Sequence, residues 1–103
     1  ATSVALLEFQ LRCEKLWGWE PEHRFHPSRG WRMDLANKAA MLAVEVEGLT
    51  FEGGRHQRFK GFTEDCKKYA EAVLLGWRLI RVTPAMVRHG IAIDYIKRAL
   101  AMT

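Results

Sequence analysis

The sequence predicts an α/β domain in which a mixed central sheet is flanked by helices. Two runs of alternating apolar and polar residues, 31–36 and 41–47, have the period of two that is typical of strands. A helical pattern follows, and the run 77–82 predicts a further strand. A strand–helix–strand step favours parallel pairing at one end of an otherwise antiparallel sheet. At 103 residues the chain predicts one domain, spanning residues 1–103.

The N-terminal part predicts a helix over residues 3–17, which Ser3 caps and which Gly18 and Pro21 end. The helix is expected to face the core with the apolar stripe Leu6, Phe9, Cys13 and Leu16. A short extended piece near residues 24–26 then leads into a turn at "HPSRG". The tryptophans expected to pack in the core are Trp17, Trp19 and Trp77.

The segment after the two strands predicts a loop over residues 48–61, because it is polar and rich in glycine. Thr63 then caps a predicted helix that runs to residue 75 and ends before Gly76. Its predicted core stripe is Cys66, Tyr69, Ala70 and Val73. Both cysteines, Cys13 and Cys66, therefore fall on apolar helical stripes. This placement predicts buried free thiols in a reducing compartment rather than a disulfide.

The C-terminal part predicts helical structure after the strand at 77–82. Thr83 and Pro84 form a cap and first-turn signal, and Gly90 separates this piece from a last amphipathic helix over residues 91–102. No apolar run reaches the ~20 residues that a membrane span needs, so we expect no membrane association. Together with the reduced thiols, this predicts an intracellular, cytoplasmic protein.

The net charge of +4 indicates a polyanionic partner such as DNA. Basic residues lie in the sequence on both sides of the acidic strands, and the expected DNA contacts are Arg24, Arg32, Arg55, Arg58, Lys60 and Lys67. A solvated basic surface is the alternative explanation for either group alone. Basic groups that flank a carboxylate cluster favour a site that uses metal and phosphate together.

Three carboxylates interrupt the two predicted strands. If the runs pair antiparallel, Asp34 and Glu45 share one face, and Glu47 follows two residues later on that face. Their mutual repulsion would cost stability unless a cation lies among them. With the backbone carbonyl of Val46 they form a set of hard oxygen ligands that suits Mg²⁺, with Mn²⁺ as a substitute. The alternative is that all three acids face solvent, with Glu45 and Glu47 paired to Arg or Lys.

Four segments in order carry a resemblance to a known family: "WRMDLA", "AVEVEG", "GGRH" and "LLGWRLIRVTP". The set resembles the PD-(D/E)xK nuclease superfamily, and within it proteins similar to very-short-patch-repair endonucleases and small phage-type Holliday junction resolvases. The resemblance implies a restriction-endonuclease-like αβββαβα core and a Mg²⁺-dependent DNA endonuclease of a bacterial or phage-infected cell. Its substrate would be branched or mismatched DNA, and a twofold dimer would suit a junction. The alternative is a catalytically inactive DNA-binding module of the same fold.

In this pattern Asp34 takes the place of the first acid and Glu45 that of the second. Glu47 stands where the superfamily has a lysine, and we expect it to act as a third acid that binds metal or activates water. The missing cation would then come from Lys60, Lys67 or Lys68. We favour Lys68 because some members carry the lysine on the following helix, although its helical phase points away from the predicted core stripe.

A histidine follows the acidic strand both in the family and here. His56 lies between Arg55 and Arg58, and its unperturbed pKa near neutrality makes it a candidate general acid or base. A surface histidine without a role is the alternative. The resemblance also implies a glutamate from the first helix, for which Glu8 and Glu14 qualify equally.

Overall fold

A computed structural model describes residues 2–48 and 55–102, with side chains described for residues 2–48 and 61–102. Within these residues eight elements follow in the order that the sequence predicts: α1 (Ser3–Cys13), β1 (Trp19–Arg24), β2 (Arg32–Asn37), β3 (Leu42–Val46), α2 (Arg55–Leu74), β4 (Arg78–Val82), α3 (Pro84–Arg88) and α4 (Ile91–Leu100). None of the helices in this described part has the length and hydropathy that a membrane crossing requires.

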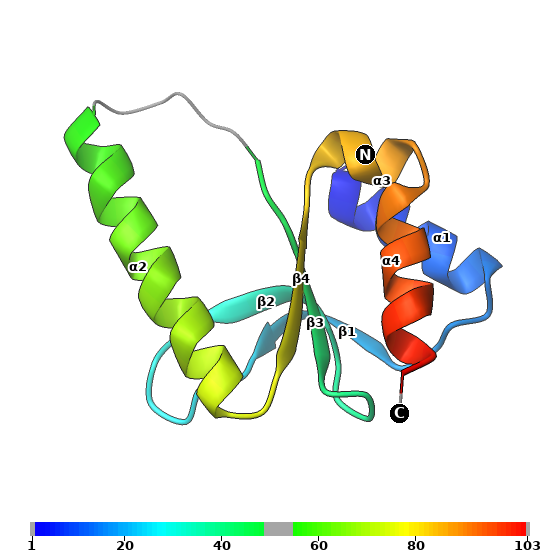
Figure 1. The fold of residues 1–103 in the computed structure, drawn as a ribbon, viewed down its shortest axis with the longest axis horizontal. Helices are drawn as coiled ribbons and strands as arrows, with labels where there is room; N and C mark the ends of the chain where they lie inside the picture. The colour runs from blue at the N-terminus through cyan, green and yellow to red at the C-terminus, as the bar shows by residue number, and fades with distance from the viewer. Residues whose placement is uncertain (1, 49–54, 103) are drawn as a thin grey trace.

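The strands form one four-stranded mixed sheet in the order β1-β2-β3-β4 (Figure 1). β1 and β2 pair antiparallel, as do β2 and β3, whereas β3 and β4 pair parallel across the α2 connection. The predicted α/β class and mixed sheet are therefore confirmed. The first strand lies earlier than the extended piece predicted near residues 24–26.

A polar side chain holds the turn between β2 and β3. Asn37 is buried; its Oδ1 accepts from the Ala40 N–H at 3.1 Å, and its Nδ2 donates to the Trp17 carbonyl at 3.1 Å. Gly18 approaches this amide with φ of 95°, a conformation that favours glycine. Because the turn fixes the register of the hairpin, it also fixes which residues of the two strands face each other.

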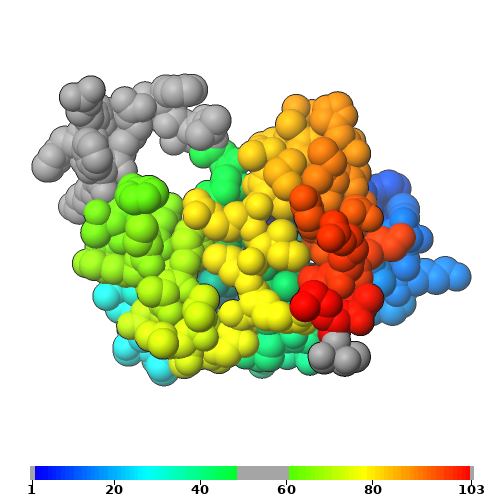
Figure 2. Space-filling view, in the orientation of Figure 1, coloured from blue at the N-terminus to red at the C-terminus, as the bar shows by residue number. Residues whose placement is uncertain are grey.

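Helices cover both faces of the sheet (Figure 1). The larger core lies between the sheet and α1, α3 and α4, and its buried residues are Leu7, Leu11, Leu35, Leu42, Val44, Val82, Val87, Ala92 and Ile96. The smaller core lies between the sheet and α2, and contains Met33, Ala36, Ala43, Ala72 and Trp77. Figure 2 shows β4 between α2 on one side and the α3–α4 pair on the other.

The phase predicted for α1 is wrong. Leu7 and Leu11 are its buried residues, whereas Phe9 and Cys13 of the predicted stripe are exposed. The cap is Thr2 instead of Ser3, because the Thr2 hydroxyl accepts from the Ala5 N–H at 3.1 Å. The helix also ends four residues early, at Cys13. Trp17 then lies beyond it and is 66% exposed, so the prediction that Trp17 packs in the core is wrong as well.

The prediction for α2 is wrong in both start and phase. The helix begins at Arg55, so part of the predicted loop at 48–61 is helical and Thr63 is not its cap. Of the predicted core stripe, Cys66, Ala70 and Val73 are exposed, and Ala72 is the residue that packs in the core. Tyr69 is the member of that stripe that meets the sheet, together with Lys68 and Ala72. Cys13 and Cys66 are both free but exposed, which contradicts the prediction of buried thiols.

The C-terminal elements agree with the sequence signals. The Thr83 hydroxyl accepts from the Met86 N–H at 3.2 Å and caps α3, with Pro84 in its first turn. Gly90, with φ of 75°, separates α3 from α4. Gly76 ends the turn between α2 and β4 with φ of 92°. These two glycines occupy the left-handed region, where a Cβ would cost about 1–2 kcal/mol.

Candidate active site

Asp34 and Glu45 face each other across β2 and β3. The backbone register ends at Leu35↔Val44, so Asp34 and Glu45 are the next residues in line. From there carboxylates replace the regular ladder: the Asp34 N–H donates to Glu45 Oε2 at 3.1 Å, and the Val46 N–H donates to Asp34 Oδ2 at 2.8 Å. Each acid is thus held by the backbone of the opposite strand. The structure brings together the two acids that the sequence pairs.

The backbone around Asp34 departs from regular strand geometry. Met33 and Leu35 lie two residues apart yet belong to cores on opposite faces of the sheet. On the other side, the β1–β2 register skips Glu22, the residue opposite Asp34, and Glu22 has φ of 52°. A positive φ is uncommon for a residue other than glycine. This distortion turns the Asp34 carboxylate toward the β3 backbone, where Glu45 lies.

Lys68 of α2 donates from Nζ to Glu45 Oε1. Both side chains are largely withdrawn from solvent, with Lys68 15% and Glu45 6% exposed. Burial raises the pKa of Glu45 from 4.5 to about 7; the adjacent Asp34 carboxylate adds to the increase, and Lys68 opposes it. Lys68 is therefore the cation beside the acid pair, although the predicted helical phase pointed it away.

Glu47 lies on the same side of the sheet but has different partners. Its Oε1 accepts from the Tyr69 hydroxyl at 2.9 Å and from Arg81 Nε at 2.8 Å. Burial and this carboxylate raise the pKa of Tyr69, so the phenol keeps its proton. The hydrogen bond from Arg81 to Glu47 raises the pKa of the guanidinium. Glu47 is held by α2 and β4 side chains, whereas Lys68 contacts Glu45.

The oxygen atoms at this site suit a hard cation in part. Among the residues whose side chains are described, no three His, Cys, Asp or Glu side chains gather as a metal site would require. Two carboxylates do converge, and Mg²⁺ is commonly held by one or two carboxylates with water and phosphate oxygens. At Val46 the group beside them is the N–H, which donates to Asp34 and cannot bind a cation, whereas the sequence predicted its carbonyl as a ligand. The raised pKa of Glu45 indicates that Lys68 does not fully offset the burial of its charge.

The predicted DNA contacts are only partly described. Arg24 and Arg32 are exposed and pair directly across β1 and β2. Lys67 is exposed on α2 and lies 3.4 Å from Glu64. The side chains of four further predicted site residues lie outside the described residues: Arg55, His56, Arg58 and Lys60.

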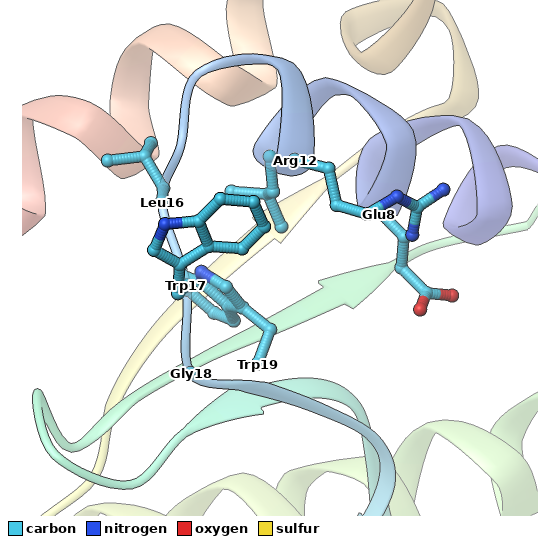
Figure 3. Close-up of a pocket in the computed structure, with 7 residues that line it drawn as sticks. Glu8, Arg12, Leu16, Trp17, Gly18 and Trp19 are labelled. Carbon is cyan, nitrogen blue, oxygen red and sulfur yellow. The ribbon is translucent and has the colours of Figure 1, made fainter.

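The glutamates of the first helix lie apart from the acid pair. The Glu14 carboxylate pairs with Lys97 of α4 at 3.4 Å, on the face of the sheet opposite α2. Glu8 lines a cavity of about 210 Å³ at the end of α1, with Arg12, Trp17 and Trp19 among its neighbours (Figure 3). Figure 3 shows that this cavity is built by α1 and the segment leading into β1, so it is separate from the candidate active site.

Tyr69 and Arg81 are site residues that the sequence pattern does not indicate. Tyr69 was predicted to be a core residue, and Arg81 was given no role. The parallel register pairs Arg81 with Glu45, but no feature of the sequence fixes that register.

A search for similar proteins finds no matching family model, curated protein or solved structure.

Proposed function

We propose that this protein is a Mg²⁺-dependent DNA endonuclease with a restriction-endonuclease-like αβββαβα core. The observation that carries the proposal is the contact of Lys68 with Glu45 beside Asp34. A strand aspartate, a second acid on the next strand and a lysine are the three groups that the PD-(D/E)xK pattern combines. In this chain the lysine comes from α2 and replaces the one missing at Glu47.

The side chains divide the chemistry between them. Asp34 and Glu45 would hold the metal, and the Val46 N–H would position the Asp34 carboxylate through its hydrogen bond. When bound, Mg²⁺ would polarise a phosphoryl oxygen and lower the pKa of a water molecule. Lys68 is within reach to hydrogen-bond that water or the phosphate, and its charge would stabilise the negative charge that develops at phosphorus. Mn²⁺ would substitute, since it takes the same oxygen ligands.

DNA is the partner that this chemistry and the charge of the chain support. The net charge is +4, and Arg24 and Arg32 present two exposed cations side by side on the β1–β2 edge. Branched or mismatched DNA is the proposed substrate, and a twofold dimer would allow paired cuts in a junction. A cytoplasmic location goes with this proposal, because that is where such DNA would be met.

A DNA-binding module that has lost catalysis is the second candidate. The absence of a lysine at position 47 is the observation that favours it. Against it stands the burial of Glu45, which costs free energy that a purely DNA-binding surface would have no need to spend. A module without catalysis would bind DNA equally well with Asp34→Asn and Glu45→Gln, and would cut none.

The test is a cleavage assay on linear, nicked, mismatched and four-way-junction DNA with and without Mg²⁺. We expect cleavage of at least one branched or mismatched DNA that needs the metal, and its loss in Asp34→Asn and Glu45→Gln. Glu64→Gln is the matched control, since Glu64 is an acid of α2 that pairs with Arg29 and Lys67. A metal-dependent wild-type activity that survives in Asp34→Asn would disprove the site.

Thermal unfolding gives a readout of the metal that does not depend on cleavage. Mg²⁺ bound by Asp34 and Glu45 should raise the Tm of the wild-type protein, because ligands that bind the folded state stabilise it. The increase should vanish in Glu45→Gln and remain in Glu64→Gln. An equal increase in all three proteins would mean that the ion binds elsewhere.

A further inference from the structure

We propose that Arg81 binds a backbone phosphate of the DNA next to the acid pair, and that Glu47 and Tyr69 position it. The phosphodiester as ligand rests on the proposed function, whereas the arrangement of the three side chains does not. Arg81 comes from β4, a strand to which the PD-(D/E)xK acid and lysine pattern assigns no catalytic group.

The sheet sets Arg81 beside the acids. β3 and β4 pair parallel with Glu45 opposite Arg81, and paired residues of adjacent strands extend on the same face. Glu47 follows Glu45 by two residues and therefore shares that face as well. The Arg81 guanidinium is thus held on the α2 side of the sheet, one strand away from the buried Glu45 carboxylate.

Two contacts fix the direction of the Arg81 side chain, and a third holds its two partners together. Its Nε donates to Glu47 Oε1 at 2.8 Å, and its guanidinium carbon lies 4.7 Å from the centre of the Tyr69 ring. The Tyr69 hydroxyl donates to the same Glu47 oxygen at 2.9 Å. A guanidinium held at Nε by a carboxylate and stacked on a ring has lost most of its freedom to move. Such an arrangement is typical of a preorganised binding group.

The remaining donors of Arg81 are free to bind an anion. Its side chain is 49% exposed, and among the residues with described side chains no acceptor lies within hydrogen-bonding distance of its two terminal nitrogens. These nitrogens form a planar fork that matches two phosphate oxygens. The pairing with Glu47 does not cancel this use, because Nε alone makes that hydrogen bond.

This arrangement gives Glu47 a role other than the third acid predicted from the sequence. Where the family has a lysine, this chain has a carboxylate that anchors a cation from the next strand. The positive charge is then supplied twice, by Lys68 at Glu45 and by Arg81 at Glu47. A phosphate between the two cations would lie beside Asp34 and Glu45.

A second Arg–Tyr–carboxylate group provides a control. Arg98 of α4 lies 5.4 Å from the Tyr95 ring centre and 4.0 Å from Asp94. Its side chain is exposed, and α4 lies on the face of the sheet opposite α2 (Figure 1). Arg98→Gln therefore removes the same charge and a similar contact at a distance from the site.

The first experiment measures the salt dependence of binding to a fluorescein-labelled four-way DNA junction in EDTA, where no metal-dependent cleavage occurs. Arg81→Gln should weaken binding and reduce the slope of log affinity against log salt by about one, the effect of losing one phosphate contact. Arg81→Lys should keep the slope and lose part of the affinity, since it retains the charge without the fork. Arg98→Gln should match the wild type. An Arg81→Gln slope equal to that of Arg98→Gln would overturn the proposal.

The second experiment separates positioning by Glu47 from metal binding. If Glu47 acts through Arg81, Glu47→Gln should lower cleavage in the wild-type background but cause no further loss in Arg81→Gln, and should leave the increase in Tm with Mg²⁺ intact. Tyr69→Phe should follow the same pattern with a smaller loss. A further loss of cleavage in Arg81→Gln, together with a smaller increase in Tm, would make Glu47 a metal ligand and overturn the positioning role.

The two proposals fail in different ways. If no DNA is cut but Arg81→Gln still reduces the salt slope, the nuclease function fails and the phosphate contact stands. If the protein cuts DNA and Arg81→Gln keeps both the rate and the slope, the phosphate contact fails and the nuclease function stands. Thermal unfolding of each variant without metal shows whether it is folded.

Discussion

Asp34 and Glu45 each accept a hydrogen bond from the backbone of the opposite strand: the Asp34 N–H donates to Glu45, and the Val46 N–H donates to Asp34. Two carboxylates that would repel each other in solution are therefore fixed side by side by backbone donors. Hydrogen bonds from the backbone partly stabilise their charges, and Lys68 contributes on the α2 side. The free energy of unfolding should therefore depend on the protonation of Glu45 and on its contact with Lys68.

The stability of the metal-free protein should fall as the pH rises from about 4.5 to about 7. Between these values the folded protein keeps the proton of Glu45, whose pKa burial raises to about 7, whereas the unfolded chain has released it. Glu45 thus stabilises the fold fully below pH 4.5, and this contribution is lost as the pH rises through 7. The change is on the order of 3 kcal/mol.

Urea unfolding at several pH values measures this contribution. In Glu45→Gln the decrease in the free energy of unfolding between pH 4.5 and 7 should be smaller, because the amide does not titrate. Glu64→Gln removes an acid from the surface of α2 and should keep the wild-type slope. A wild-type stability that rises over this range would show that Glu45 is ionised in the folded protein.

Lys68→Met should destabilise the protein far more than Lys67→Met. Above pH 7, where Glu45 is ionised, Lys68 and the buried Glu45 form an ion pair, and removing one partner of such a pair costs roughly 3 kcal/mol. Lys67 is exposed and pairs with Glu64 at 3.4 Å, so its loss should cost less than about 0.5 kcal/mol. The loss in Lys68→Met should grow with pH, because the unpaired Glu45 protonates more readily at low pH.

A double-mutant cycle provides the control for this pair. Adding Glu45→Gln to Lys68→Met should restore much of the stability, because no buried charge is then left without a partner. Equal costs for the two lysine variants would mean that Lys68 is solvated and does not face Glu45.

The fold could be predicted from the sequence where the pattern is local. Alternation indicated β2 and β3, and Thr83, Pro84 and Gly76 marked the ends of the later elements. The pairing of Asp34 with Glu45 followed from the antiparallel hairpin alone. The sequence could not show the break in alternation at Asp34, because a strand distortion of this kind depends on the neighbouring strands.

The helical phases of α1 and α2 were harder to predict. Cys66, Tyr69, Ala70 and Val73 make the most continuous apolar stripe of α2, and this pattern predicts that they face the core. In the structure Cys66, Ala70 and Val73 are exposed, and Tyr69 meets the sheet together with Lys68. Hydrophobic periodicity therefore gave the wrong phase, because charged partners on the strands decide which side of α2 turns inward.

Both cysteine thiols should react with a thiol reagent in the native protein. Cys13 and Cys66 are free and exposed, and only access and the pKa of a thiol limit its reaction. We expect two equivalents of 5,5′-dithiobis(2-nitrobenzoate) to react without denaturant, and Cys66→Ser to lose one of them with little change in stability. A Cys66 thiol that reacts only after unfolding would show that the exposed side of α2 with Cys66, Ala70 and Val73 is covered in solution.

Arg24 and Arg32 should weaken the metal-free fold while strengthening DNA binding. They are directly paired across β1 and β2, and like charges in such a pair destabilise a sheet by about 0.2–1 kcal/mol. Arg24→Gln should therefore raise the free energy of unfolding at low salt, and the gain should disappear near 1 M salt, where surface charges are screened.

The same variant should bind the four-way junction less tightly and reduce the salt slope by about one, because a phosphate contact is lost. Arg88→Gln, an exposed residue at the end of α3, is the matched control and should change neither slope nor affinity. A variant Arg24→Gln that gains stability but keeps the wild-type salt slope would move the DNA path away from the β1–β2 edge.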